Sequence, residues 1–272
     1  MHTELWRVAR ALLYARALDS LEAAPIAGTE GARVPFFSPD GQWVGFWAQG
    51  KLRRWPTAGG IPADIAEWPA VPLGAAWSSR GDIVLGTDGN GLHILRAGER
   101  AFSRLTTPDN SREASHVLPY FLPGGERLLF TVKPHPWGTR SHVEALALAG
   151  GERTVLIESG ADARLLPTGH LAYMAEGTLM AVPFDPDRLK VTGQALPLVN
   201  GVAQALNALS SNANSGAAQW SYSAGGTLVY AAGSIHPDLE TRVAWVDREG
   251  RSEPTVEPEP LVTSQHVLQP SE

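Results

Sequence analysis

Cysteine is absent from all 272 residues of the chain. Without it there can be no disulfide framework and no thiolate chemistry. An extracytoplasmic bacterial protein is compatible with this absence, although the absence does not require one.

A basic surface is also lacking. Lys and Arg total 22 against 28 Asp and Glu, which gives a formal net charge of −6. Proteins that bind nucleic acid present a basic stripe or patch to the phosphate backbone. The densest basic cluster, Lys51 with Arg53 and Arg54, alternates with apolar residues and is typical of one face of a strand. We therefore expect no nucleic-acid partner.

Long hydrophobic runs are missing too. No stretch reaches the roughly 18 consecutive apolar residues that a membrane-spanning helix needs. Glu4, Arg7, Arg10 and Arg16 are dispersed through the N-terminal region, which lacks the apolar block of a signal peptide. The sequence predicts no direct membrane insertion and shows no export or anchoring device of its own.

The composition that remains is that of an ordinary globular protein with many turns. Apolar residues make up 43% and charged residues 18%, and there are 28 Gly and 21 Pro. High Gly and Pro contents are expected where many short strands are joined by tight turns. The nine Trp residues are expected mainly in the core, because each indole ring buries a large area.

One short pattern occurs five times. A large apolar residue is followed by a small polar or Pro-containing turn, a glycine four residues on, and a short apolar run; the closing glycines are Gly41, Gly81, Gly125, Gly169 and Gly226. Most spacings between them match the 40 to 45 residues, roughly, of one four-stranded propeller blade. The copies occupy residues 37–46, 77–85, 121–130, 165–173 and 222–230.

These repeats predict an all-β fold, a β-propeller of four-stranded antiparallel blades. We expect five complete blades plus an N-terminal half blade, on a six-bladed plan that the chain either completes or leaves incomplete. The half blade is residues 12–27, the propeller extends over residues 1–255, and a poorly structured tail follows at residues 256–272. An alternative for residues 4–13 is a helix, because apolar residues there sit near helical spacing. The predicted blades are residues 31–67, 73–107, 116–158, 163–199 and 217–255.

The Ser38-Pro39-Asp40-Gly41 turn and its looser copies resemble the WD40-like PD40 repeats of TolB-type six-bladed β-propellers. Residues 14–33, 170–173 with 177–185, and 244–250 are similar to segments of the C-terminal propeller of a group of bacterial Ser/Thr protein kinases. In that group the propeller follows a cytoplasmic kinase domain and usually a membrane span. The resemblance implies an extracytoplasmic, periplasmic location. Kinase motifs themselves are missing from this sequence.

Several single residues could be interpreted as catalytic or metal-binding, but each has a simpler structural explanation. Asp40 is expected to cap its turn. Asp185 and Asp187 offer fewer oxygens than a calcium loop needs. His135 and His142 flank an irregular loop, and no third zinc ligand is evident nearby.

The glycine-rich stretch at residues 86–91 resembles a phosphate loop only superficially, because it lies in a predicted hairpin and not before a helix. No Gly-x-Ser-x-Gly elbow marks a nucleophile. We therefore assign no catalytic, cofactor-binding or metal-binding residue, and we expect no cofactor.

Two functions are compatible with the sequence. The first is a non-catalytic module for protein–protein interaction or ligand sensing, with a protein partner or small ligand at the propeller face. The second is a propeller hydrolase, such as a lactonase, with a metal site at the channel mouth. An incomplete ring also leaves an open blade edge through which the chain could self-associate. The tentative interaction surface consists of Arg33, His116, Trp137, Arg164, Asn207, Asn212 and Asn214, with residues 205–216 expected as a surface loop.

Overall fold

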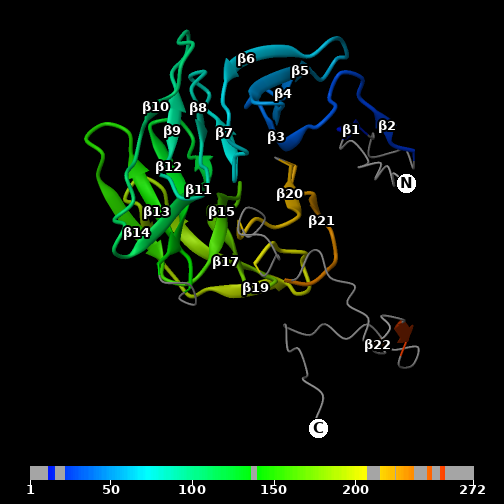
Figure 1. Cartoon of the computed structure of the whole chain (residues 1–272). Coiled ribbons are helices and arrows are strands. Elements are labelled where there is room, and N and C mark those ends of the chain that lie inside the picture. Colours follow the sequence, from blue (N-terminus) through cyan, green and yellow to red (C-terminus); the bar gives the residue numbers. More distant parts are fainter. Residues whose placement is uncertain are drawn as a thin grey trace.

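The computed structural model describes residues 12–15, 22–135, 140–206, 215–223, 225–235, 244–246 and 252–254. Within these ranges the regular structure consists of strands, and no helix occurs. Figure 1 shows successive antiparallel sheets lying side by side, with their first strands toward a common centre. This arrangement confirms the expected all-β fold with propeller blades.

Four sheets contain four strands in sequence order, and we call them blades 1 to 4. The fourth also carries the short strand β18 (Lys190–Val191) beside its third strand. Blade 1 is β3 (Arg33–Phe37), β4 (Trp43–Ala48), β5 (Lys51–Pro56) and β6 (Ala63–Glu67); blade 2 is β7 (Ala75–Trp77), β8 (Ile83–Leu85), β9 (His93–Leu95) and β10 (Ser103–Arg104). Blade 3 is β11 (Glu113–Phe121), β12 (Arg127–Pro134), β13 (His142–Ala147) and β14 (Arg153–Ile157); blade 4 is β15 (Ala161–Leu165), β16 (His170–Ala175), β17 (Thr178–Asp185) and β19 (Leu196–Val199).

The repeated turn forms as its residue types predict. In blade 1 the Gly41 N–H donates to Ser38 O at 2.9 Å, and Gly41 has a φ of 68°. Asp40 Oδ1 accepts from the N–H of Gln42 at 3.0 Å and from the Ser38 hydroxyl. The hydrogen bond from Ser38 lowers the pKa of Asp40. Asp40 is therefore a turn cap, as expected from its position before glycine.

A second repeated feature was not anticipated. The first strand of each blade contains or follows a residue with positive φ, seven positions before the turn glycine: Val34 (52°), Gly74 (109°), Leu118 (51°) and Asp162 (51°). In blades 1, 3 and 4 the residue lies within a register shift of the first strand pair. Such bulges bend a strand locally.

The inner strands of neighbouring blades touch directly at these positions. A Cβ on Gly74 would lie 2.7 Å from Leu118 Cα, so only glycine allows this approach. The Leu118 N–H also donates to Leu73 O at 2.9 Å, which joins blade 3 to blade 2 by backbone.

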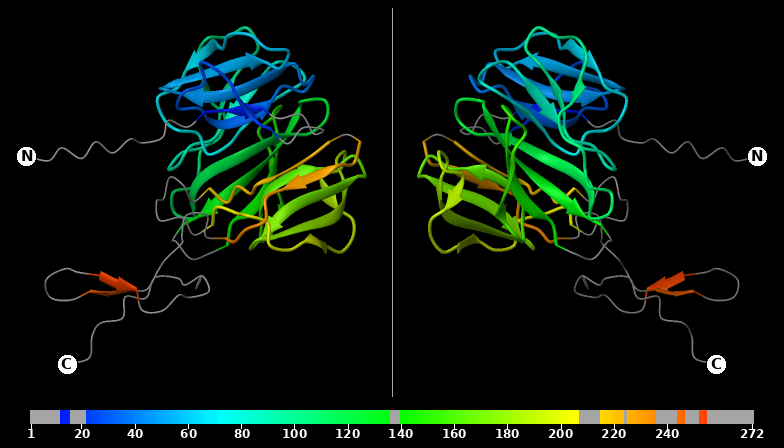
Figure 2. Two further views of the ribbon diagram at one scale, coloured as in Figure 1. Left: turned by 90° about the vertical axis from the view of Figure 1, so that its right-hand side faces the viewer. Right: turned by 90° about the vertical axis from the view of Figure 1, so that its left-hand side faces the viewer.

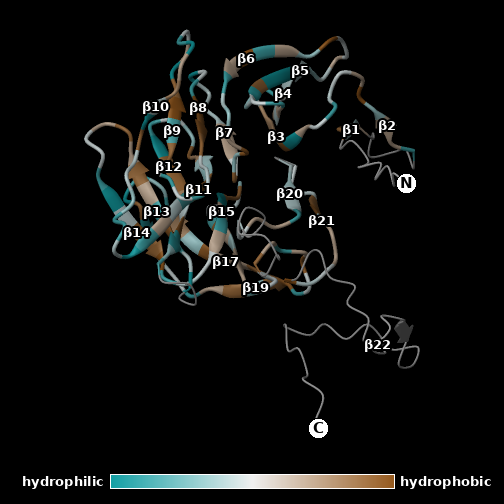
Figure 3. Ribbon diagram, viewed as in Figure 1, coloured by the Kyte–Doolittle hydropathy of each residue, from teal (hydrophilic) through white to brown (hydrophobic). Residues whose placement is uncertain are grey.

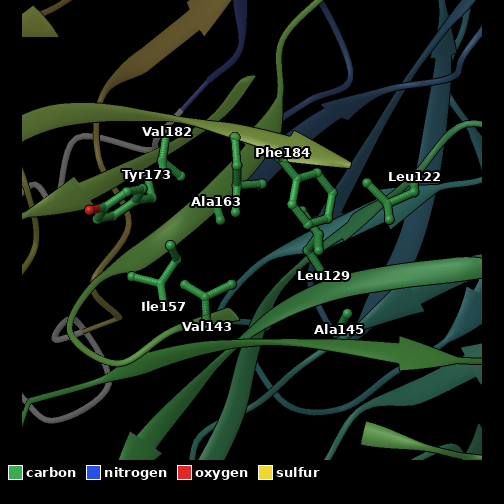
Figure 4. Packing of buried hydrophobic residues seen from close by; sticks show 10 residues of the cluster. Leu122, Leu129, Val143, Ala145, Ile157, Ala163, Tyr173, Val182 and Phe184 are labelled. Atoms are coloured by element: carbon green, nitrogen blue, oxygen red, sulfur yellow. The ribbon is translucent and has the colours of Figure 1, made fainter. Parts of the chain in front are cut away.

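Hydrophobic side chains fill the space between adjacent blades. Blades 2 and 3 share a core that includes Val84, Leu92, Ile94, Leu128 and Phe130. The core between blades 3 and 4 is the largest and is shown in Figure 4: Leu122, Leu129, Val143, Ala145, Ile157, Ala163, Leu171, Tyr173, Val182 and Phe184. Because each blade supplies one wall of two cores, removing a buried side chain weakens contacts between blades as well as within one.

After blade 4 the pattern changes. The strands β20 (Trp220–Tyr222) and β21 (Leu228–Tyr230) form a two-stranded sheet. This sheet is tied to blades 3 and 4 because the Tyr222 hydroxyl donates to Leu165 O and accepts from the Tyr120 hydroxyl at 2.7 Å. Burial and the hydrogen bond with Tyr222 raise the pKa of Tyr120, which stays neutral.

In the part of the chain that the structure describes, β20 and β21 are two of the four strands expected for the blade at residues 217–255. Among the described residues, β22 (Ala244–Val246) and β23 (Ser252–Pro254) pair only with each other, and Figures 1 and 2 show them apart from the four blades. Beyond β21 the chain pairs instead with the segment after blade 4, where the Ala203 N–H donates to Ala231 O at 2.9 Å and the Gly233 N–H to Gly201 O at 2.9 Å.

The N-terminal strands β1 (Tyr14–Ala15) and β2 (Ala24–Pro25) form another two-stranded sheet, inside the region expected as a half blade. The side chain of Leu13 packs against the core that contains Phe46 of blade 1. Residues 4–11 of the alternative helix and the tail at residues 256–272 lie outside the described residues.

Candidate functional site

A cavity of about 350 Å³ lies at the end of the molecule where β11 and β15 begin. Its walls come from the end of β12, the end of β16, and residues 204–206 and 215–216, with Ile235 closing one side. Positions separated by more than 100 residues thus meet at one place. A volume of roughly 300 Å³ or more is that of a site for a small molecule.

The cavity lining combines apolar side chains with hydroxyl groups. Met174, Leu206 and Ile235 contribute the larger apolar surfaces. The hydroxyl-bearing residues are Ser141, Ser159 and Ser215. This mixture of apolar wall and a few polar groups is typical of ligand sites.

Gln204 holds the cavity wall together. Its side chain is 1% exposed; Oε1 accepts from the Gly177 N–H at 2.9 Å and Nε2 donates to Gly216 O at 2.9 Å. Because the amide links three separate segments through buried hydrogen bonds, it fixes the wall.

The charged groups at the cavity are paired. Lys133 Nζ lies 2.9 Å from Asp88 Oδ1, which connects the end of β12 to the hairpin turn of blade 2. The exposed rim pair Arg140–Glu176 has an N–O distance of 3.2 Å. The partly buried Lys133–Asp88 pair fixes the wall more firmly than the exposed pair, since water screens surface ion pairs.

A second cavity, of about 320 Å³, adjoins the first, and Ala114 lines both. Its lining includes Asp88, Ser115, Glu113 and His135. Within the part of the chain that the structure describes, no three His, Asp or Glu side chains are grouped so that they could hold a metal ion.

Behind this second cavity a buried polar network runs through blade 3. With the proton on Nε2, His116 donates to Glu113 at 3.0 Å, and its Nδ1 accepts from the Thr106 hydroxyl at 2.7 Å. Glu113 also pairs with Arg153 at 2.5 Å, and Arg153 pairs with Glu144 at 2.6 Å. The two carboxylates and one guanidinium compensate one another in a region of low dielectric.

The environment shifts the pKa values of this network. Burial alone would raise the pKa of Glu113, but hydrogen bonds from Arg153, the Asp109 N–H and His116 lower it to about 2. Burial lowers the pKa of His116, although Glu113 acts in the opposite direction. Both shifts favour an ionised Glu113 beside a neutral imidazole at neutral pH.

Thr106, His116 and Glu113 have the order of groups found in a hydroxyl–imidazole–carboxylate triad, but here they lie inside the protein. His116 is 0% and Thr106 7% exposed. The Thr106 hydroxyl also accepts from the Leu92 N–H at 2.8 Å. This network therefore positions backbone between blades 2 and 3.

Gly91→Ala is expected to destabilise the protein by disturbing this region. A Cβ on Gly91 would lie 1.9 Å from Thr106 O, so the backbone must shift, at a cost of about 2–3 kcal/mol in free energy of unfolding. Urea denaturation measures the loss. Gly225→Ala is the matched control, because the nearest atom to its Cβ is Ser223 Oγ at 3.7 Å. Equal small effects of both substitutions would contradict this close contact.

The residues predicted to form an interaction surface differ in their positions and burial. Arg33 is exposed, at the start of β3. The prediction that His116 belongs to an interaction surface is wrong, because this residue is fully buried. Thr106 and Glu113 hydrogen-bond to its two ring nitrogens, and Phe130 packs edge-to-face against the ring with the centroids 5.0 Å apart. Trp137, Asn207, Asn212 and Asn214 lie outside the described residues.

Arg164 is a quarter exposed and has a structural role. It pairs with the buried Asp162 at 3.0 Å, donates to Trp220 O at 2.8 Å and lies 4.4 Å above the Trp220 ring. Asp162 Oδ2 also accepts from the Ala218 N–H at 3.1 Å. Arg164 and Asp162 thus attach β20 to blade 4.

The two histidines that flank residues 136–141 have separate environments. His135 lines the second cavity. His142 lies 3.0 Å from Glu144 and belongs to the buried network.

Neither Gln204 nor Lys133 was predicted from the sequence as a residue of the cavity. Of the two, only Lys133 carries a feature in the sequence that could have marked it: it is a lysine that directly follows the apolar stretch of a strand.

Among the described residues there is no helix with the length and apolar character needed to cross a membrane.

Comparison with known proteins gives structural matches only. No sequence-family profile matches the chain, and no curated protein matches it. Three solved structures represent the structural matches. TolB from Acinetobacter baumannii is 16% identical with a TM-score of 0.55, and the match covers 72% of this chain and 51% of TolB. Regucalcin from Agrobacterium tumefaciens, described as a calcium-binding protein, is 15% identical with a TM-score of 0.53, covering 82% of this chain and 72% of regucalcin.

A luciferin-regenerating enzyme is 10% identical with a TM-score of 0.54, and the match covers 74% of this chain and 68% of the enzyme. The chain thus spans about half the length of the TolB structure and about two thirds of the enzyme. Identities this low establish shared architecture and leave function to the site itself. The chain has the β-propeller fold seen in TolB and regucalcin.

Proposed function

We propose that this chain is a non-catalytic binding module that holds a small ligand in the cavity at the start of β11 and β15. The single observation that carries the proposal is the cavity of about 350 Å³, with apolar walls and serine hydroxyls, at the converging ends of two inner strands. In propellers the loops of several blades converge there, so one ligand can contact several blades.

The bonding of the cavity side chains supports binding over catalysis. Gln204 and Lys133 are engaged in structural contacts at 2.9 Å, and Arg140 is paired with Glu176. A general base or a nucleophile must instead present its reactive atom to the substrate. We assign the three serine hydroxyls the role of hydrogen-bonding partners for the ligand.

Rigidity of the walls favours recognition without large rearrangement. The cavity is lined by strand ends that are held by the buried hydrogen bonds of Gln204 and by the partly buried Lys133–Asp88 pair. A preorganised site loses little conformational entropy on binding, so more of the contact free energy appears as affinity. A protein partner at this face would gain from the same rigidity.

The resemblance to propellers of bacterial Ser/Thr protein kinases supports a sensing role within a larger signalling protein. In such a protein the ligand would have to bind one state of the module more tightly than another, since equal affinity for two states shifts no equilibrium. The enzyme alternative has its support in the fold, because the structural relatives include a luciferin-regenerating enzyme.

Ser159→Trp is expected to abolish ligand binding, because the indole would occupy the cavity that Ser159 lines. The measurement is a thermal-shift titration of the native chain and the variant with a panel of monosaccharides, amino acids and dicarboxylic acids. At least one probe should raise the Tm of the native chain saturably, by roughly 2–5 °C if the probe is present well above its Kd.

Ser79→Trp is the matched control, since Ser79 is exposed in the turn of blade 2 away from the cavity. The Ser79→Trp variant should show the same ligand-induced rise in Tm as the native chain. A Tm response retained in Ser159→Trp would place the ligand elsewhere, and turnover of a lactone or ester that is lost in Ser159→Trp would replace the binding module by the hydrolase.

A further inference from the structure

The strand β21 presents an uncovered apolar edge. Leu228, Val229 and Tyr230 are 37%, 51% and 45% exposed. In each of blades 1 to 4 the second strand pairs with a third strand, whereas β21 pairs with β20 and with no third strand among the described residues. An open strand edge of this kind offers backbone groups to another strand.

The hydrogen bonds of β21 show which amides are available. The Ala231 N–H donates to Gln219 O at 2.9 Å, on the side of β20. N–H groups alternate in direction along a strand, so Val229 points its N–H the same way as Ala231. The N–H groups of Leu228 and Tyr230 therefore face the open side.

A second uncovered apolar surface lies on the last strand of blade 4. Leu196 and Leu198 of β19 are 64% and 50% exposed, and Figure 3 colours this strand as hydrophobic. Corresponding last-strand residues of earlier blades are covered by the next blade's third strand. Ala66 shares a core with Leu95, and Ile157 shares one with Val182.

One missing element would cover both surfaces: a third strand beside β21 that also lies over β19. The spacing of β22 and β23 fits this element. In blade 3 the third and fourth strands begin 17 and 28 residues after Gly125. The strands β22 and β23 begin 18 and 26 residues after Gly226.

We propose that the β22–β23 hairpin of this same chain docks along β21 and over β19, as the third and fourth strands of a fifth blade. The sequence of β22, Ala-Trp-Val, is apolar, as is the stretch Met180-Ala181-Val182 within β17, the third strand of blade 4. The structure shows the hairpin undocked, and docking converts the two-stranded sheet into a four-stranded blade.

The connection favours the chain's own hairpin over that of a second copy. Thirteen residues separate Tyr230 from Ala244, enough to span up to roughly 45 Å when extended. Neighbouring strands are only about 4.8 Å apart, so reach imposes no limit. A short tether also gives an effective concentration of about 1 mM or more, well above that of a separate molecule in dilute solution.

Disulfide trapping tests the proposal, and the cysteine-free chain makes the result unambiguous. Val229→Cys is combined in turn with Ala244→Cys, Trp245→Cys and Val246→Cys in the full chain, at micromolar concentration under mild oxidation. At least one pair should form an intramolecular disulfide in most molecules, seen by non-reducing electrophoresis and by mass spectrometry of the linked peptides.

Val155→Cys is the matched control, because Val155 lies on β14 and is 46% exposed, close to the 51% of Val229. Pairs with Val155→Cys should give at least fivefold less intramolecular product. Equal yields for the two positions would overturn the proposal. A predominance of disulfide-linked dimers would also overturn it, and would assign the edge to a second copy.

Hydrogen exchange provides a second measurement that needs no crosslink. Docking should slow exchange of the Leu228 and Tyr230 amides by at least tenfold relative to the full-length Trp245→Asp variant, in which a carboxylate disfavours docking. Equally fast exchange in the native chain and the variant would contradict the docked blade.

Discussion

Phe130→Ala is expected to lower the free energy of unfolding by about 3–5 kcal/mol, the range for removing a buried aromatic ring. Phe130 is 1% exposed and packs in the core between blades 2 and 3. Its ring also meets His116 edge-to-face at 5.0 Å and lies 5.5 Å below the Arg153 guanidinium. The substitution therefore opens a cavity between blades and removes the apolar cover of a buried ion network.

Urea denaturation followed by intrinsic fluorescence measures this loss as a shift in transition midpoint. Phe37→Ala is the matched control, since Phe37 carries the same ring at 66% exposure. It should change the free energy of unfolding by no more than about 0.5 kcal/mol. Comparable losses for the two substitutions would show that the interface between blades 2 and 3 is not the source of stability.

Glu113→Gln is expected to lower the free energy of unfolding at pH 7 by about 2–4 kcal/mol, because a neutral amide forms weaker hydrogen bonds than the carboxylate with its partly buried donors. The glutamine keeps the shape of the side chain but removes the charge that pairs with Arg153 at 2.5 Å and accepts from His116 at 3.0 Å. Arg153 would keep only Glu144 as an anionic partner, at 2.6 Å.

This loss should depend on pH in a defined direction. Glu113 has a pKa of about 2 in the folded protein, below its ordinary value of 4.5. The contribution of its charge is therefore complete above pH 4.5 and disappears as the pH falls toward 2. Unfolding measured at pH 7, 5 and 3 should show the native chain and Glu113→Gln becoming more alike in stability as the solution becomes acidic.

His116 adds an acid sensitivity that both proteins share. Because burial lowers its pKa, the unfolded state binds a proton below the ordinary value of 6.5 that the folded state does not. The stability of both proteins should therefore fall as the pH drops below that value. Glu126→Gln is the control; its carboxylate is 76% exposed and pairs with Arg80 at the surface, so its effect should stay below about 0.5 kcal/mol. If Glu113→Gln lowers the free energy of unfolding by the same amount at pH 7 and pH 3, Glu113 does not contribute through its negative charge.

Turn chemistry explains why so much of the fold could be predicted. Gly41, Gly81, Gly125 and Gly169 all have positive φ at the predicted turns. Hydrogen bonds such as that from Gly41 N to Ser38 O span three residues, so the information lies within one short stretch of sequence. The bulge residues seven positions earlier were missed, since Val34 and Leu118 carry no residue type that signals a positive φ.

His116 shows the limit of such reasoning at the site. A histidine before an inner strand can face a channel or a core with the same local sequence. Its burial depends on Glu113 and Phe130 of its own blade 3 and on Thr106 of blade 2, which reaches it only when the two blades pack. The same applies to the cavity, whose walls come from many separate parts of the chain between Ala114 and Ile235.

The short-range pattern of apolar residues, turns and glycines determined that this chain forms antiparallel strands grouped into blades, because strand alternation and tight turns depend on residues close together in sequence. Tertiary packing alone decided which polar groups are buried and where Gln204 and Lys133 meet to line a cavity. These features arise from contacts between distant segments, whose free energy depends on how neighbouring blades fit together.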